Sequence, residues 1–201
     1  MKYEKMVNSA IDYYNKNAHD FYNNTVNADM SEHYKRFEKH LILGSRILDA
    51  GCGSGRDSLY FHTKGYKVDA FDASDAMVNL SSQLTGLSVH HARFEDVTFE
   101  DKFNGIWACA SLLHIGREAI RGVLQRLVDM LCKDGVFYMS FKYGNKAYEK
   151  DGRSFNCYDE NAFSRMIETL PELRILELYK TKDCRACKDD EYWLSAILVK
   201  I

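Results

Sequence analysis

Residues 47–58 read Ile-Leu-Asp-Ala-Gly-Cys-Gly-Ser-Gly-Arg-Asp-Ser, and this stretch constrains the fold more than any other. Its first apolar residues favour a buried strand, and its alternating glycines allow a tight turn into a following helix. The amino end of a helix offers unpaired N–H groups to a ligand. Asp72 lies seventeen residues after Gly55, at the end of a second strand-like run, 67–71. A carboxylate there can accept both hydroxyls of a ribose. We therefore expect a nucleoside-containing cofactor at the carboxyl edge of a parallel sheet.

The spacing of the glycines separates two kinds of cofactor. A dinucleotide-binding turn has the pattern G-x-G-x-x-G, whose third glycine admits a pyrophosphate. This chain has G-x-G-x-G followed by Arg56, so a nicotinamide oxidoreductase is disfavoured. The run Asp-x-Gly-x-Gly-x-Gly, which begins at Asp49, resembles motif I of the class I S-adenosylmethionine-dependent methyltransferases. Asp72 resembles the acidic ribose ligand in motif II of that family. The resemblance covers nearly the whole chain and includes small bacterial members of the tellurite-resistance type.

Strand-like and helix-like segments alternate along the chain. Strands are expected at 46–50, 67–71, 88–91, 104–110, 136–141, 174–179 and 193–200, and helices at 6–21, 31–43 (with Ser31 as N-cap), 56–63, from Ser74 and Asp75 onward, 117–131 and 159–169. This alternation predicts a parallel sheet with helices on both faces. The last two strands are joined by a polar segment without a helix, which predicts an antiparallel hairpin.

Together with the resemblance, this order predicts an α/β fold with a Rossmann-like, seven-stranded methyltransferase sheet. The sheet should be mostly parallel and end in an antiparallel hairpin. We expect a single domain over residues 1–201, in which 1–43 form a helical lid and 44–201 form the Rossmann-like core. The chain has 201 residues, 46% of them hydrophobic, which suits one globular domain with a sizeable core.

Composition also disfavours several functions and locations. The formal net charge is −2, and no Lys/Arg cluster stands out, so a nucleic-acid partner is disfavoured. No apolar run reaches about 18 residues, so no membrane partner is expected. The amino-terminal segment lacks the apolar core of a signal peptide, which favours a cytoplasmic location. Of six cysteines, only Cys184 and Cys187 form a CxxC pair, and no second pair completes a zinc site, so no metal is expected.

The resemblance implies a set of residues that bind S-adenosyl-L-methionine and its product, S-adenosyl-L-homocysteine. Gly51 and Gly53 would lie under the methionine and ribose, Asp49 near the ammonium group, Asp72 on the ribose and Met77 over the adenine. The further candidates are Tyr14, Arg56, Ala73, Glu95, Asp96, Ala110 and Ser111.

Three of these candidates, Glu95, Asp96 and Arg56, also have a structural interpretation. Family members place an acid against the adenine amino group after the third strand, where Asp96 is favoured over Glu95; the alternative is a solvated turn. Arg56 would hold the cofactor carboxylate or an anionic substrate; the alternative is a helix-surface arginine.

His114 is the candidate catalytic residue. It follows the fourth expected strand at the edge where α/β proteins bind ligands, and a neutral imidazole there can accept a proton from the acceptor. The alternative is a packing or capping histidine. The aromatic residues Tyr13, Tyr14, Phe21 and Tyr22 are candidates for a lid over the cofactor or for ordinary helix packing. Substrate-side candidates are Lys142, Tyr143, Arg153 and Arg185, each with solvated surface charge as the alternative.

These observations predict methyl transfer to a small-molecule acceptor by in-line displacement. Two other functions stay open. One is an RNA-modifying methyltransferase, most plausibly for tRNA, and the other is a catalytically inactive partner subunit that still binds the cofactor.

Overall fold

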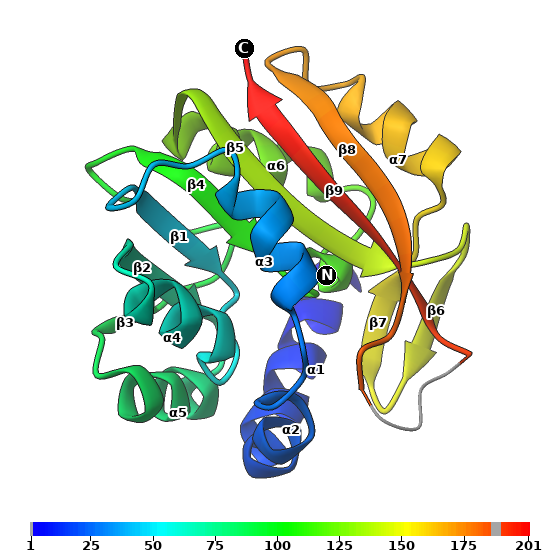
Figure 1. Cartoon of the computed structure of the whole chain (residues 1–201). Helices are drawn as coiled ribbons and strands as arrows, with labels where there is room; N and C mark the ends of the chain where they lie inside the picture. Colours follow the sequence, from blue (N-terminus) through cyan, green and yellow to red (C-terminus); the bar gives the residue numbers. More distant parts are fainter. Residues whose placement is uncertain (1, 186–189) are drawn as a thin grey trace.

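The computed structural model describes residues 2–185 and 190–201, and its centre is a seven-stranded sheet (Figure 1). The strands are β1 (Arg46–Ala50), β2 (Lys67–Asp72), β3 (Val89–His91), β4 (Phe103–Ala108), β5 (Leu131–Lys142), β8 (Leu173–Lys182) and β9 (Tyr192–Lys200). Their order is β3-β2-β1-β4-β5-β9-β8. The first five are parallel, and β9 pairs antiparallel with both β5 and β8. The predicted Rossmann-like sheet with its antiparallel carboxyl-terminal hairpin is therefore confirmed.

Helices cover both faces of the sheet because alternate strand residues point to opposite sides. The helices are α1 (Lys2–Lys16), α2 (Ala18–Thr25), α3 (Ser31–Glu38), α4 (Arg56–Thr63), α5 (Asp75–Thr85), α6 (Ile120–Met130) and α7 (Glu160–Ile167), with a 3₁₀ turn η1 (Leu112–His114). Trp107 and Tyr138 pack with Phe37 of α3 and Phe61 of α4. On the other face, residues of β1, β4, β5 and β9 pack with α6 and α7. Among the described residues, no helix is long and apolar enough to cross a membrane.

The amino-terminal helices differ from the expectation. The single helix expected at 6–21 is two helices, because Asn17 has φ −116° and ψ 21° and interrupts the regular geometry. The prediction that Ser31 caps α3 is wrong, since Met30 holds the cap position and Asp29 accepts a hydrogen bond from the Ser31 N–H at 2.9 Å. Figure 1 shows α1 and α2 at the edge toward which β1 runs. These helices are therefore placed beside the carboxyl ends of the parallel strands.

A separate two-stranded hairpin was not predicted. It consists of β6 (Ala147–Lys150) and β7 (Arg153–Asn156), inserted between β5 and α7. The turn residues Asp151 and Gly152 both have positive φ, 52° and 74°, as in a type I′ hairpin turn. The Ser9 hydroxyl of α1 donates to the Gly152 carbonyl at 2.5 Å. The hairpin thus packs against α1 at the same edge of the sheet.

Candidate functional site

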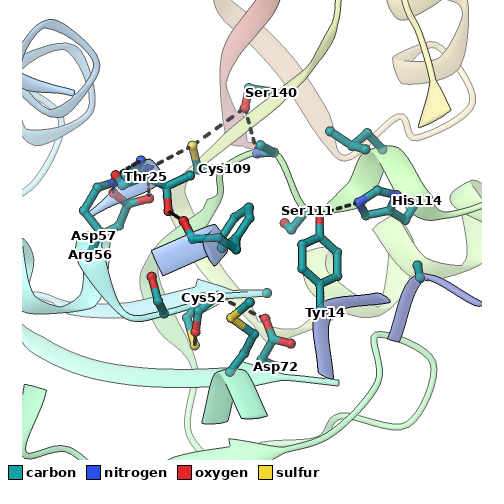
Figure 2. Close-up of a pocket in the computed structure, with 18 of the residues that line it drawn as sticks. Tyr14, Thr25, Cys52, Arg56, Asp57, Asp72, Cys109, Ser111, His114 and Ser140 are labelled. Atoms are coloured by element: carbon teal, nitrogen blue, oxygen red, sulfur yellow. Dashed lines mark hydrogen bonds and ion pairs between the residues drawn. The ribbon is translucent and has the colours of Figure 1, made fainter. Parts of the chain in front are cut away.

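A cavity lies at the carboxyl ends of β1, β2, β4 and β5, next to α1 and α2 (Figure 2). Of the residues predicted from the sequence, it is lined by Tyr14, Gly51, Gly53, Arg56, Asp72, Ala73, Met77, Ala110, Ser111 and His114. Asp49, Glu95 and Asp96 are not among the residues that line it. At the third strand, Ala92 and Phe94 line the wall instead. The structure therefore brings most of the predicted residues together.

Asp72 and the glycine loop form the best-defined part of the cavity. One Asp72 carboxylate oxygen accepts from the Gly53 N–H at 2.9 Å, and the other accepts from the Ser74 N–H at 2.9 Å. Burial raises the pKa of Asp72, while these backbone donors oppose the shift. Each oxygen keeps further acceptor capacity, so the carboxylate is held in position and can still receive two ribose hydroxyls.

Glycine at position 51 is required by close packing. Its φ is 75°, and a Cβ there would lie 2.5 Å from the Ser111 Cβ. The Ser111 hydroxyl donates to the Ala50 carbonyl at 2.7 Å, which joins the turn after β4 to the end of β1. Ala110 has φ 53°, a strained conformation for a residue with a side chain, and its N–H donates to the Ser140 hydroxyl at 2.9 Å. The expected strand 104–110 therefore stops at Ala108, and the chain turns along the cavity.

Asp49 lies beneath the glycine loop and is 1% exposed. The Ser58 hydroxyl donates to its carboxyl group at 2.6 Å. Burial, reinforced by the nearby Asp57, raises the pKa of Asp49 to about 8. A role near the cofactor ammonium group stays a prediction, since Asp49 does not reach the cavity surface.

Arg56 is not a helix-surface arginine, because its side chain is only 20% exposed and lines the cavity. Its Nε and Nη2 donate to the two oxygens of Asp57 at 2.6 and 2.9 Å. Asp57 also accepts from the Tyr34 hydroxyl at 2.5 Å and from Trp107 Nε1 at 2.9 Å. Burial opposes its ionisation, but Arg56 and these donors hold the pKa of Asp57 below its usual value. The sequence did not identify Asp57 as the centre of a buried network.

His114 contacts two groups through its two ring nitrogens. Its Nδ1 lies 2.8 Å from the Ser154 carbonyl oxygen, and its Nε2 lies 3.0 Å from the Tyr14 hydroxyl. A carbonyl only accepts, so Nδ1 carries the proton and Nε2 accepts from Tyr14. Burial lowers the pKa of His114 to about 4. The imidazole is therefore neutral at physiological pH, and Figure 2 shows it beside Tyr14 on the side of the cavity away from Arg56.

The cavity is also lined by some of the substrate-side and lid candidates and by residues that the sequence did not suggest. Lys142, Arg153 and Arg185 line it, whereas Tyr143 does not. Of the aromatic lid candidates, Tyr14 and Phe21 line it, and Tyr13 and Tyr22 do not. The unpredicted hairpin contributes Arg153 and Phe155. Its Asp-Gly turn was the sequence signal that could have revealed it.

The cysteine pair is described only in part. Cys184 has a free thiol, and Cys187 lies outside the described residues. In the part of the chain that the structure describes, no group of three or more His, Cys, Asp or Glu side chains is placed to hold a metal ion.

Comparisons with known proteins agree with this geometry. Residues 47–135 match the model of a methyltransferase domain family. The chain is 25% identical over 158 residues to an uncharacterized methyltransferase of Staphylococcus carnosus, a match that covers 74% of this chain and 75% of that protein. It is also 25% identical over 92 residues to TehB of Haemophilus influenzae, a probable S-adenosyl-L-methionine-dependent methyltransferase, over 43% of this chain and 32% of that protein.

Two solved structures show the same fold. One is 1,6-didemethyltoxoflavin-N1-methyltransferase of Burkholderia thailandensis, with a TM-score of 0.81, 20% identity, and coverage of 98% of this chain and 90% of that one. The other is a TehB-like methyltransferase of Corynebacterium glutamicum, with a TM-score of 0.73, 17% identity, and coverage of 94% and 100%. Residues 47–135 therefore match a methyltransferase domain, and the sheet, with the glycine loop beside Asp72, has the fold of these two solved methyltransferases.

Proposed function

We propose that this enzyme transfers a methyl group from S-adenosyl-L-methionine to a small-molecule acceptor and releases S-adenosyl-L-homocysteine. The observation that carries the proposal is the extent of the cavity. It runs from Asp72 and the glycine loop to a further wall formed by Ser140, Trp193 and Phe155. A partly open cavity whose wall continues beyond the cofactor residues suits a small acceptor. The Burkholderia neighbour, whose structure contains bound 1,6-didemethyltoxoflavin and S-adenosylhomocysteine, supports this class of acceptor.

The residues of the cavity fit an adenosyl cofactor. Asp72 would accept the ribose hydroxyls, Met77 and Phe94 would contact the adenine, and Phe21 would present an aromatic face to the sulfonium. When bound, the cofactor supplies an activated methyl group on a sulfonium, so the protein mainly has to align the acceptor and exclude water. Residues 1–43 would act as the lid over the core 44–201, because α1 and α2 supply Tyr14, Phe21 and Thr25 to the cavity wall.

Tyr14 and His114 would handle the proton that the acceptor loses. His114 Nε2 already accepts from the Tyr14 hydroxyl, so an acceptor O–H or N–H reaches the imidazole through Tyr14. The acceptor proton would pass to the Tyr14 oxygen as the Tyr14 proton passes to Nε2, leaving an imidazolium that still donates to the Ser154 carbonyl. His114→Ala should therefore lower turnover while sparing cofactor affinity, and Tyr14→Phe should lower turnover as well. Full activity in both variants would show that Tyr14 and His114 have a structural role and take no part in proton transfer.

The first experiment is a calorimetric titration of the protein with S-adenosylmethionine, S-adenosylhomocysteine and NADH. We expect micromolar binding of the two adenosyl compounds and none of NADH; binding of NADH alone would overturn the proposal. Methyl transfer from radiolabelled cofactor to a deproteinised cell extract, with tRNA as the competing substrate, then distinguishes the acceptors. Label in tRNA would favour an RNA-modifying enzyme, and cofactor binding without any transfer would favour a partner subunit.

We also propose a cytoplasmic location. The described cysteines are all free thiols, which is typical of a reducing compartment. Fractionation of the native cell with an antibody against this chain tests the location.

A further inference from the structure

Four buried or partly buried Lys and Arg side chains line the cavity, and three of them face carboxylates that are themselves shielded from solvent. Arg56 pairs with Asp57, whose side chain is 8% exposed. Lys142 and Arg185 both pair with Asp183, at 3.3 and 2.6 Å, and the Asp183 side chain is 1% exposed. Glu191 is a second carboxylate that pairs with both cations. These positive charges are compensated within the protein, so none of the three requires an anionic ligand.

Arg153 differs from the other three cations. Its ion pair in the described structure is a single contact from Nη2 to Asp151 at 3.3 Å, and the Asp151 side chain is 53% exposed. A single ion-pair contact to a carboxylate that is this exposed contributes little. The Arg153 side chain is only 13% exposed, and its Nε is buried without a hydrogen-bond partner among the described residues. A buried donor without a partner is costly unless a ligand supplies the acceptor.

The surroundings of Arg153 hold the guanidinium in place without neutralising it. Its Cζ lies 3.6 Å from the Tyr13 ring centroid, 5.1 Å from that of Phe155 and 5.6 Å from that of Tyr14. Aromatic faces attract a cation and leave its charge intact. The same side of the cavity contains the hydrogen-bonded pair of Tyr14 and His114. A fixed positive charge therefore stands next to the groups proposed to receive the acceptor proton.

We propose that Arg153 binds a carboxylate of the methyl acceptor and orients the acceptor toward Tyr14. This proposal rests on the proposed function and names its substrate class: a small acid with one carboxylate and an apolar or aromatic body. A planar carboxylate matches the N–H pattern of a guanidinium. A single negative charge matches the guanidinium of Arg153, whereas a phosphate dianion carries a second negative charge and would be repelled more strongly by Asp72 in the same cavity. The apolar body would pack against Phe155, Leu113 and Ile115.

Benzoate and benzamide are matched probes, because they share a ring and differ in charge. Each is titrated calorimetrically into the protein saturated with S-adenosylhomocysteine. We expect benzoate to bind at least about tenfold more tightly than benzamide, as a charge-assisted pair implies. Arg153→Met should abolish this preference, and Arg153→Lys should keep part of it. Asp151→Asn is the matched control and should retain the preference, because it removes only the exposed partner. Equal binding of the two probes by the unaltered protein, or an unchanged preference in Arg153→Met, overturns the proposal.

The cofactor itself carries a carboxylate, so a second pair of probes identifies the source. S-adenosylhomocysteine has the amino-acid tail, and 5′-methylthioadenosine lacks it. The acceptor proposal expects Arg153→Met to bind both as the unaltered protein does. If the variant loses at least tenfold in affinity for S-adenosylhomocysteine alone, Arg153 binds the cofactor and the acceptor proposal is overturned. Failure of the unaltered protein to bind either adenosyl compound would instead count against the proposed function, and benzoate binding can still be measured without them.

Discussion

Two of the arginines that line the cavity, Arg56 and Arg153, lie on opposite sides of it and have opposite surroundings. Arg56 at the start of α4 is locked to Asp57 by two hydrogen bonds, and Asp57 is also held by Tyr34 and Trp107. Arg153 on β7 is held by aromatic rings and has one exposed carboxylate nearby. In the sequence both look alike, since each arginine lies within two residues of an aspartate. The burial of that aspartate separates a structural arginine from one available to a ligand.

This difference also predicts how the protein should respond to substitutions on the Arg56 side and on the Arg153 side of the cavity. The Arg56 side is a closed network in which each partner needs the others, so damage there should appear as lost stability. The Arg153 and His114 side faces the ligand, so damage there should appear mainly in binding, turnover or pH dependence.

The largest effect is expected from Arg56→Met. The change leaves the Asp57 carboxylate buried without its counter-charge and should lower the free energy of unfolding by about 3–5 kcal/mol. Urea unfolding followed by circular dichroism measures it. The double variant Arg56→Met/Asp57→Asn removes both charges and should recover at least half of the loss. A loss below about 1 kcal/mol in the single variant would contradict the closed network.

A pH-dependent effect is expected from His114, whose pKa is lowered to about 4 by burial. In the unfolded chain His114 has its usual pKa near 6.5, so the unfolded chain binds the proton first as the pH falls. The contribution of His114 to the free energy of unfolding is therefore fully present above pH 6.5 and is lost as the pH falls toward 4. The loss should reach up to about 3 kcal/mol. Urea unfolding at several pH values should show a flatter profile in His114→Gln, whereas His62→Gln at an exposed site should match the unaltered protein. Identical profiles in all three proteins would refute this assignment.

Asp72→Ala should weaken cofactor binding more than it weakens the fold. Losing the ribose acceptor should cost about 2–3 kcal/mol, or roughly 30- to 150-fold in affinity for S-adenosylhomocysteine. Calorimetry measures the affinity, and Asp75→Ala, an exposed acid at the start of α5 with a 73% exposed side chain, serves as the control. Unchanged affinity in Asp72→Ala would remove Asp72 from the cofactor site.

The smallest stability effect is expected from Arg153→Met, which tests the comparison directly. Its pair with Asp151 is one contact at 3.3 Å to a carboxylate that is 53% exposed, so the free energy of unfolding should change by less than about 1 kcal/mol. The same urea experiment as for Arg56→Met compares the two arginines. A loss of several kcal/mol would show that Arg153 is structural and that the two sides of the cavity do not differ as described.

The sequence predicted the sheet and the glycine loop beside Asp72 because both are encoded locally. Apolar runs mark the strands, and the alternating glycines Gly51, Gly53 and Gly55 mark the turn after β1. Asp72 sits directly at the end of β2. Such features need only the order of neighbouring residues.

The features that the sequence did not predict depend on contacts between distant segments. Asp57 gains its role from Tyr34 and Trp107, which are 23 and 50 residues away. The roles of Tyr14 and His114 arise from a contact across 100 residues. The β6–β7 hairpin is short and largely polar on β6, so its strand pattern is weak, although its Asp-Gly turn carried a usable signal.

The hairpin forms its own two-stranded sheet, apart from the seven-stranded one, yet it supplies Arg153 and Phe155 to the cavity and the carbonyl of Ser154 to His114. The sequence of residues 147–156 can therefore change during evolution without disturbing any strand pairing of the large sheet. The hairpin can therefore be exchanged as a unit, either in evolution or by protein engineering. If the hairpin binds the acceptor as we propose, a graft of another hairpin should change the acceptor and leave the glycine loop and Asp72 in place.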